Sequence, residues 1–314
     1  MRAFSTLALA ALLGAFTSNA SPFAKRRPVS ETLLADMKLM SQYASAAYCK
    51  PNIDSPGGTV YCGSGKCPLV QAANVESLEE YSEAETSTDV TGYIAADHTH
   101  KLLIVAFRGS RTPDNWITNF DFAMMPTTLC PKCVAHSGFW RSWTDARRRV
   151  VSALKNSTAQ YPGYQIRVTG HSLGGAVATF AAAGLRTEGF DVAMYTFGAP
   201  RIGGPSVSDF ISKQAGGNYR ITHWNDPVSR IPFLTMGYVH VTPEYYIDVK
   251  NKQEVRTSDI KVLDGSWNLK GNAKWLAMDP EAHMWFFHHL NVCGGKKSKR
   301  RGALAEDMHV IARF

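Results

Sequence analysis

A serine flanked by glycines stands in the run Gly170-His171-Ser172-Leu173-Gly174-Gly175, which fits the pattern Gly-x-Ser-x-Gly. The β-rich run 165–169 precedes it, and the small residues 176–183 that follow favour a helix. A strand, a sharp turn and a helix in this order form a nucleophile elbow, in which a strained backbone holds the serine hydroxyl clear of the sheet. The glycines suit the point where strand and helix cross, because a Cβ has no room there. A phosphate loop is the weaker alternative, since no Lys-Ser or Lys-Thr pair follows. We therefore predict that Ser172 is a catalytic nucleophile.

A serine nucleophile needs a base that removes its proton, and the base needs an anion that holds its tautomer. After an elbow these partners follow the serine in the order acid, then histidine. Asp226 comes directly after the predicted strand 219–223, at the carboxyl edge where parallel sheets place their sites. Asp191 and Asp209 are expected on connections or helix faces, and Asp248 is the second choice. We predict that Asp226 is the acid.

Five of the ten histidines follow Asp226 in the chain: His240, His283, His288, His289 and His309. His283 follows the turn Asp279-Pro280-Glu281, which can swing it over the sheet edge, so it is our choice for the base. His309 belongs to the tail and His240 to a predicted strand, whereas His288 and His289 stay open as alternatives. We expect His171, next to the nucleophile, to point the opposite way and to be structural.

The oxygen of a tetrahedral intermediate needs preorganised hydrogen-bond donors. The backbone N–H of Leu173, directly after the nucleophile, is one predicted donor. The second should come from a loop after an earlier strand, and Ser110 follows the predicted strand 101–107 with both an N–H and a hydroxyl. A serine that merely caps the next turn is the alternative reading of Ser110.

An amphipathic segment follows this loop. Its apolar residues are Trp116, Ile117 and Phe120, and its polar residues fall largely on the other side of a short helix. An ordinary packed turn would look the same. Its position beside a site loop favours a mobile lid whose apolar face meets lipid at an interface.

Strands alternate with helices along most of the chain. We expect helices over 30–48, 137–157 and 205–214, strands over 91–96, 101–107, 165–169, 192–197 and 219–223, and a final strand pair within 237–249. This order predicts an α/β fold of the α/β-hydrolase type, with a mostly parallel central sheet covered by helices on both faces. No internal repeat or long linker interrupts 28–293, so we predict one catalytic domain, with a surface loop over 50–75.

Both ends of the chain differ from this body. Residues 1–20 combine a basic start, an apolar run too short to span a bilayer, and a small-x-small cleavage site, which indicates a secretory signal peptide. Residues 21–27 end in Lys25-Arg26-Arg27 and are predicted to be a short propeptide. The basic stretch 294–314 is expected to be a disordered tail. We therefore expect a secreted, extracellular protein without a transmembrane segment.

The location of the charge decides what the formal net charge of +8 means. The first 27 residues carry +4 and the tail 294–314 carries +4, which leaves the body neutral. A neutral body argues against a nucleic-acid surface on the catalytic domain. No metal or organic cofactor is implied, and we expect a monomer. Asn156, in Asn-Ser-Thr, is a candidate for N-glycosylation.

Six cysteines in a secreted chain indicate disulfides, although counting alone allows fifteen pairings. Cys62 and Cys67 enclose a short turn, which favours a local bridge. Cys130-Pro-Lys-Cys133 has no thioredoxin-like setting, so a structural bridge is favoured over a redox pair. Cys49 and Cys293 remain as the third pair. Histidines at the spacing of a zinc site are lacking.

Several of these motifs occur in the same order in one family. The pieces are Phe107-Arg108-Gly109-Ser110-Arg111, Asn115-Trp116-Ile117, the elbow 170–175, Phe197-Gly198-Ala199-Pro200-Arg201, Asn225-Asp226 and Ala282-His283-Met284-Trp285. In these the chain resembles, over about residues 22–293, the secreted filamentous-fungal lipases of the class-three lipase family. The resemblance implies a Ser172–Asp226–His283 triad, an oxyanion hole shaped by Ser110 and Leu173, a lid near 111–121, and the same three disulfides.

Two positions depart from the subgroup that the chain resembles. Pro227 follows the acid where an aliphatic residue is usual, and Ser229 replaces a proline soon after. Both changes lie in the loop that carries Asp226, so we expect a slight shift of that loop. The tail 294–314 is an addition to the family pattern.

The predicted activity is carboxylic ester hydrolysis, and a triacylglycerol lipase working at the lipid–water interface is the leading hypothesis. The apolar residues 116, 117 and 120 favour it over a feruloyl esterase, which by the resemblance has a more polar lid. A mono- or diacylglycerol lipase of the same family is a second alternative. A non-catalytic lipid-binding protein on this fold is a distant one, because no triad member is missing.

Overall fold

The computed structural model describes residues 28–293 except 54, 64, 83–86, 112–120 and 291. The predicted signal peptide, propeptide and basic tail lie outside the described residues. So does the predicted lid segment with Trp116, Ile117 and Phe120. Within the described part, no helix has the length and apolarity that crossing a membrane requires.

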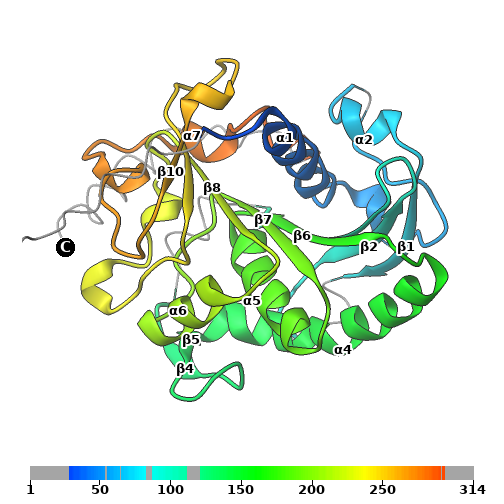
Figure 1. The fold of residues 1–314 in the computed structure, drawn as a ribbon, viewed down its shortest axis with the longest axis horizontal. Coiled ribbons are helices and arrows are strands. Elements are labelled where there is room, and N and C mark those ends of the chain that lie inside the picture. Colours follow the sequence, from blue (N-terminus) through cyan, green and yellow to red (C-terminus); the bar gives the residue numbers. More distant parts are fainter. Residues whose placement is uncertain are drawn as a thin grey trace, which may run out of the picture.

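The centre of the molecule is an eight-stranded sheet with the strand order β1-β2-β3-β6-β7-β8-β9-β10 (Figure 1). The strands from β3 to β9 run parallel, and antiparallel pairing occurs at both ends, where β1 and β2 precede β3 and β10 follows β9. The bounds are β1 Val75–Tyr81, β2 Gly92–Asp97, β3 Leu102–Phe107, β6 Gln165–His171, β7 Val192–Phe197, β8 Asn218–His223, β9 Glu244–Ile247 and β10 Ile260–Leu263. A small separate sheet pairs β4 (Met124–Pro126) with β5 (Val134–His136). The predicted mostly parallel sheet is confirmed.

Helices cover both faces of this sheet. Helix α1 (Glu31–Ala46) lies on one face, and α4 (Ser137–Gln160), α5 (Leu173–Thr187) and α6 (Pro205–Lys213) lie on the other (Figure 1). Central strands such as β3 are buried along their whole length, since each face meets helices. Two apolar cores result, one around α4 and α5 and one around α1.

The first helix begins as the sequence predicts. The Ser30 side chain accepts a hydrogen bond from the backbone N–H of Leu33 at 3.1 Å, which satisfies one of the unpaired donors of the first turn. The predicted loop 50–75 contains a short 3-10 helix, η1 (Lys50–Asn52), and the short helix α2 (Pro68–Ala72). Three bridges, Cys49–Cys293, Cys62–Cys67 and Cys130–Cys133, are present as expected.

The edges of the sheet differ from the prediction. Strand β1 was not predicted, because three glutamates interrupt its apolar residues and glutamate is rare in strands. The final strand pair is not contained in 237–249. Strand β9 pairs instead with β10, whose residues follow a polar loop. Periodicity within a single window cannot reveal a partner that lies beyond such a loop.

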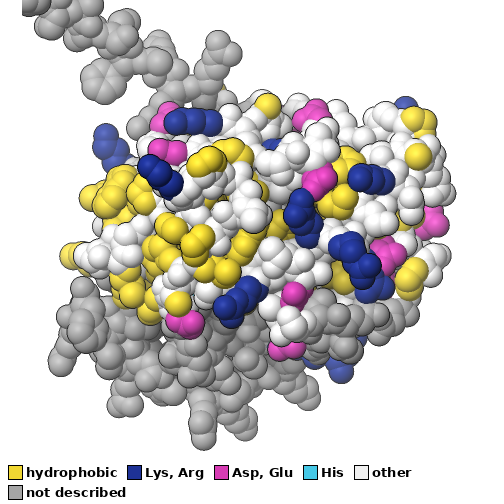
Figure 2. Space-filling model, turned by 90° about the horizontal axis from the view of Figure 1, so that it is seen from below, with side chains coloured by type: hydrophobic (Ala, Val, Ile, Leu, Met, Phe, Trp, Pro, Cys, Tyr) yellow, Lys and Arg dark blue, Asp and Glu magenta, His cyan; other side chains and the backbone are white. Residues whose placement is uncertain are grey.

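Figure 2 shows hydrophobic side chains gathered on the left of the view, with charged side chains of both signs spread over the whole of this face. The exposed large hydrophobic residues include Trp267, Leu269 and Leu276, which are 59%, 61% and 95% exposed. All three lie in the loop between β10 and the short helix α7 (Pro280–Met284).

Candidate active site

The elbow has the geometry that its sequence predicts. Ser172 lies between β6 and α5 with φ 58° and ψ −131°, a strained conformation for a residue with a Cβ, and its side chain is buried. A Cβ on Gly170 would lie 2.3 Å from the carbonyl oxygen of Gly174, so only glycine fits where the strand meets the helix. Strand and helix therefore hold Ser172 in one place.

The predicted acid and base are in contact. Asp226 lies three residues beyond the end of β8, and His283 lies on α7, whose first turn is capped by the Asp279 side chain. Nδ1 of His283 is 3.1 Å from Oδ2 of Asp226, and both side chains are buried. The other carboxylate oxygen accepts the Val228 N–H at 2.8 Å. A buried carboxylate with these donors can fix the tautomer of the imidazole.

The turn after β7 joins this pair to the elbow. The N–H of Ser172 donates to the carbonyl of Phe197 at 2.9 Å, and the next residue, Gly198, has φ 58°. A Cβ on Gly198 would lie 2.8 Å from Asp226 Oδ2 and 2.9 Å from His283 Nδ1. The absence of a side chain at position 198 therefore lets the acid–base pair lie against the strand end beside Ser172.

Two atoms that the predicted chemistry needs are free of protein partners in the part of the chain described. Neither Ser172 Oγ nor His283 Nε2 has a hydrogen-bond partner there, although both are buried. Catalytic hydrogen bonds in ligand-free enzymes are often long and tighten only when substrate binds. Nε2 is the ring nitrogen left unbound by Asp226, so it is the one that can receive the serine proton.

His171 packs against His283 and contacts its backbone. Its Nε2 lies 2.8 Å from the carbonyl oxygen of His283, its Nδ1 lies 2.8 Å from the hydroxyl of Tyr48, and the two imidazole centroids are 4.5 Å apart. Burial lowers the pKa of His171 well below its usual value, and the neighbouring His283 lowers it further. A neutral ring then donates from Nε2 to the carbonyl and accepts from Tyr48 at Nδ1, a tautomer assigned from the network.

Tyr48 also reaches the loop after β3. Its hydroxyl accepts a backbone hydrogen bond from Gly109, and burial is the main reason that the pKa of Tyr48 lies far above its usual value. A Cβ on Gly109 would lie 2.1 Å from this hydroxyl and 3.1 Å from the Ser172 Cβ. Nothing in the pattern of the first helix distinguishes Tyr48 from a core residue, and sequence reasoning missed it.

The predicted oxyanion-hole residues lie at the start of α5 and after β3. Leu173 is the first residue of α5, where backbone N–H groups lack intrahelical partners, and Ser110 is half-buried in the loop that contains Gly109. A Cβ on Gly174 would lie 2.3 Å from the Phe107 carbonyl oxygen. The end of β3 and the start of α5 are therefore packed together.

The departures at 227 and 229 leave the contact between acid and base in place. Pro227 precedes the 3-10 helix η3 (Val228–Arg230), where its missing N–H costs nothing. The hydroxyl of Ser229 donates to Oδ2 of Asp226 at 3.1 Å. The sequence indicated only that Ser229 could shift the acid loop, whereas in the structure its hydroxyl is a hydrogen-bond donor to the carboxylate.

The alternatives left open in the sequence lie elsewhere. Asp248 forms ion pairs with Lys261 and Lys274, away from His283. His288 contacts the Ser41 hydroxyl at 3.1 Å. His240 is not in a strand and borders a polar chamber behind the acid loop. Asn156 is exposed on α4, so its predicted glycosylation remains a prediction.

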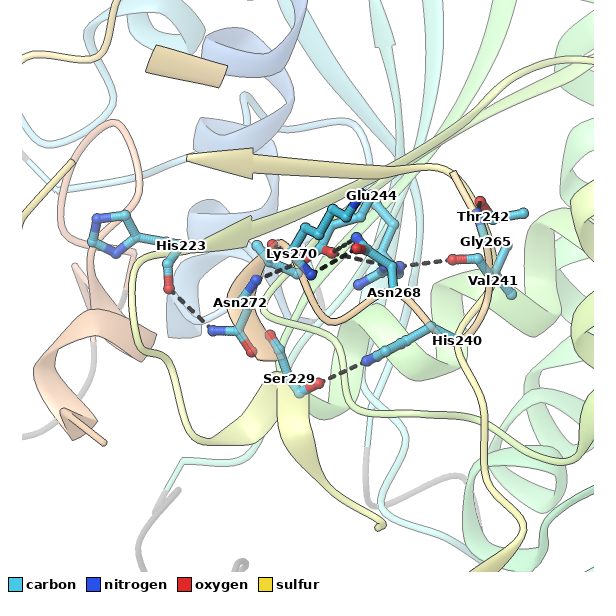
Figure 3. A network of polar contacts seen from close by, with 12 residues as sticks. His223, Ser229, His240, Val241, Thr242, Glu244, Gly265, Asn268, Lys270 and Asn272 are labelled. Atoms are coloured by element: carbon cyan, nitrogen blue, oxygen red, sulfur yellow. Dashed lines mark hydrogen bonds and ion pairs between the residues drawn. The ribbon is translucent and has the colours of Figure 1, made fainter. Parts of the chain in front are cut away.

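This chamber contains the network of Figure 3. Its wall includes Arg201, Arg220, Ser229, His240, Glu244 and Asn272. Glu244 accepts hydrogen bonds from the Thr222 hydroxyl at 2.6 Å and the Asn268 amide at 2.8 Å. Asn272 donates to the backbone carbonyls of Trp224 and Asp226, each at 3.0 Å. The network thus holds the backbone of the acid loop through Asn272.

A strand–elbow–helix serine, a buried histidine–aspartate pair and a mostly parallel sheet define an α/β-hydrolase. Family models identify the particular group: the model described as lipase (class 3) matches residues 104–236, and that of the lipase 3 N-terminal region matches residues 3–79. The chain belongs to the class 3 lipase family, and it is a lipase, a carboxylic ester hydrolase.

Two similar proteins support the assignment of the chain to this family. The chain is 42% identical over 275 residues to the secreted mono- and diacylglycerol lipase A of Penicillium camembertii, covering 86% of this chain and 89% of that protein. It is 38% identical over 261 residues to the secreted mono- and diacylglycerol lipase 1 of Fusarium solani, covering 83% and 78%. These relatives agree with the prediction that the protein is secreted.

Solved structures show the same fold. The crystal structure of a mono- and diacylglycerol lipase from Aspergillus oryzae has a TM-score of 0.79 and 39% identity, covering 85% of this chain and all of that one. The triacylglyceride lipase of Rhizomucor miehei has a TM-score of 0.71 and 24% identity, covering 85% and 99%, and shares the fold.

Proposed function

We propose that this protein is an acylglycerol lipase that cleaves its substrate through an acyl-enzyme, with Ser172 as nucleophile, His283 as base and Asp226 as acid. The observation that carries the proposal is the strained, buried serine at the elbow, together with a histidine whose Nδ1 lies 3.1 Å from a buried carboxylate. These are the groups that activate a hydroxyl for attack on an ester.

The chemistry follows from the positions of the groups. His283 Nε2 takes the Ser172 proton as Oγ attacks the ester carbonyl, and Asp226 stabilises the imidazolium that forms. The N–H of Leu173 and donors of Ser110 stabilise the negative oxygen of the tetrahedral intermediate. The intermediate collapses when His283 gives its proton to the departing alcohol. A water molecule, deprotonated by the same nitrogen, then releases the fatty acid.

Among acylglycerols we propose mono- and diacylglycerols as the preferred substrates. The relatives at 38–42% identity carry these names, whereas the named triacylglyceride lipase shares the fold at 24% identity. A triacylglycerol lipase remains the second candidate, because the apolar residues Trp116, Ile117 and Phe120 favour a lid that opens at an oil surface. Feruloyl esters rank below both.

The protein is proposed to act at the lipid–water interface as a monomer. Trp267, Leu269 and Leu276 are exposed in the loop immediately before the helix that carries His283. Exposed apolar groups of this kind mark surfaces that bind lipid or protein. Contact of this loop with lipid would bring the predicted site close to its substrate.

A substrate panel tests the proposal. Monoolein, diolein, triolein, phosphatidylcholine and methyl ferulate are assayed as monomers where soluble and as emulsions. We expect diolein and monoolein to be cleaved faster than triolein, with a rise in rate when a partly soluble ester exceeds its solubility limit. Fastest cleavage of triolein would favour the triacylglycerol lipase, and fastest cleavage of methyl ferulate would favour the esterase.

The triad has its own test. Ser172→Ala should lower hydrolysis of every ester in the panel by several orders of magnitude, because no other group is proposed to form the acyl-enzyme. Gel filtration of the variant at the wild-type elution volume serves as the control for folding. Ester hydrolysis that survives this substitution would refute the assigned mechanism.

A further inference from the structure

The Asp226 carboxylate has a hydrogen-bond donor that the mechanism above does not use. The Ser229 hydroxyl lies 3.1 Å from Oδ2, the same oxygen that faces His283 Nδ1 at 3.1 Å. The Val228 N–H holds the other oxygen at 2.8 Å. Val228 and Ser229 thus hold one carboxylate oxygen each, so together they fix the plane of the carboxylate without the help of His283.

Ser229 is itself held in position. It is 2% exposed, and its carbonyl oxygen lies 2.6 Å from Nε2 of His240, so the ring donates to it (Figure 3). Burial lowers the pKa of His240 well below its usual value, and the charges of Arg220 and Arg201 lower it further. A neutral imidazole here keeps one N–H for the carbonyl of Ser229. The hydroxyl is therefore presented to Asp226 from a fixed backbone.

We propose that Ser229 is a positioning residue for the reaction, whose hydroxyl fixes the Asp226 carboxylate in the orientation that receives His283 Nδ1–H. This inference rests on the proposed function, because it assigns Ser229 a role through the proposed acid. Ser229 touches neither Ser172 nor the reacting ester in the proposed mechanism. Its loss should therefore lower the rate of the chemical step and leave substrate binding unchanged.

The test is a set of variants assayed on a soluble short-chain p-nitrophenyl ester below its solubility limit, which removes any contribution from an interface. For Ser229→Ala we expect kcat to fall about three- to tenfold with KM unchanged, as for one charge-assisted hydrogen bond that helps to orient the acid. The second-order rate constant for inactivation by a fluorophosphonate should fall by the same factor, because that reaction reports activation of Ser172 alone.

Two further variants separate positioning from a general loss of structure. Ser229→Thr keeps the hydroxyl at a residue that lines the polar chamber, so it should recover most of the wild-type kcat. Ser142→Ala removes a buried serine hydroxyl that donates to the Gly138 carbonyl within α4, and it should retain full activity.

Each outcome bears on one of the two claims. Wild-type kcat and inactivation rate in Ser229→Ala, or a Thr variant as slow as the Ala variant, would overturn the positioning role while Ser172→Ala still abolishes activity. Activity that persists in Ser172→Ala would overturn the proposed function instead. Unfolding curves of all variants show whether a loss of rate reflects a loss of folded protein.

Discussion

Alanine at position 198 offers the sharpest test of how the site is assembled. The added Cβ would lie 2.8 Å from Asp226 Oδ2, 2.9 Å from His283 Nδ1 and 3.1 Å from its Cε1. Ordinary contacts to a Cβ begin near 3.4 Å, so the acid–base pair must move away by about half an ångström or the β7 turn must shift. Because about 1 Å of misplacement costs on the order of 10²-fold in rate, we expect kcat to fall about ten- to a hundredfold.

The same substitution also strains the backbone, and this effect must be separated from the clash. Gly198 has φ 58°, a left-handed conformation that costs about 1–2 kcal/mol for a residue with a Cβ. Gly189 at the end of α5 provides the matched control, since it has φ 90° and no atom within 4 Å of an added Cβ. Gly189→Ala should therefore lose similar stability and keep its activity.

The measurements are kcat on a soluble ester and the free energy of unfolding in urea. Our reasoning requires a large fall in kcat for Gly198→Ala only, with a modest and comparable loss of stability in both variants. Wild-type kcat in Gly198→Ala would show that the site accommodates a methyl group between its parts, and the proposed packing would be wrong. Equal losses of activity in both variants would assign the effect to strain.

Three other predictions follow from single contacts. Replacing Cys49 and Cys293 together by alanine removes a bridge across 244 residues, and the unfolding free energy should fall by about 5 kcal/mol in the chain-entropy model; a loss below about 1 kcal/mol would contradict it. Burial lowers the pKa of His288 to about 4. The unfolded state therefore binds a proton that the folded state excludes, and His288 contributes a loss of up to about 3 kcal/mol of stability as pH falls from about 6.5 towards 4. His288→Gln should reduce the slope of stability against pH by this share, since the other buried histidines still contribute; an equal slope would count against burial of His288 as a cause. Tyr48→Phe leaves buried Nδ1 of His171 without its donor, so the unfolding free energy should fall by about 1–3 kcal/mol and kcat should fall with it; unchanged stability would argue against the assigned hydrogen bond.

Local patterns account for the parts of the fold that the sequence predicted well. Strand β7 over Val192–Phe197 has the predicted bounds, because it is a mostly apolar run that is followed by a glycine. Helix α1 begins after its predicted cap at Ser30. Strand β1 was missed because acidic residues interrupt its apolar pattern. The pairing of β9 with β10 was missed because a long polar loop separates the two strands.

The sequence by itself determined the elbow, because a strained serine between small residues is specified within six consecutive positions. The order of residues after it singled out Asp226 and His283, and the structure brings these two into contact. Only the tertiary structure decided what surrounds them. Tyr48 and Gly198 meet the site through packing between segments far apart in the chain, and no local spacing encodes such contacts. Ser229 lies only three residues from Asp226, but the conformation of the acid loop decides that its hydroxyl meets the carboxylate.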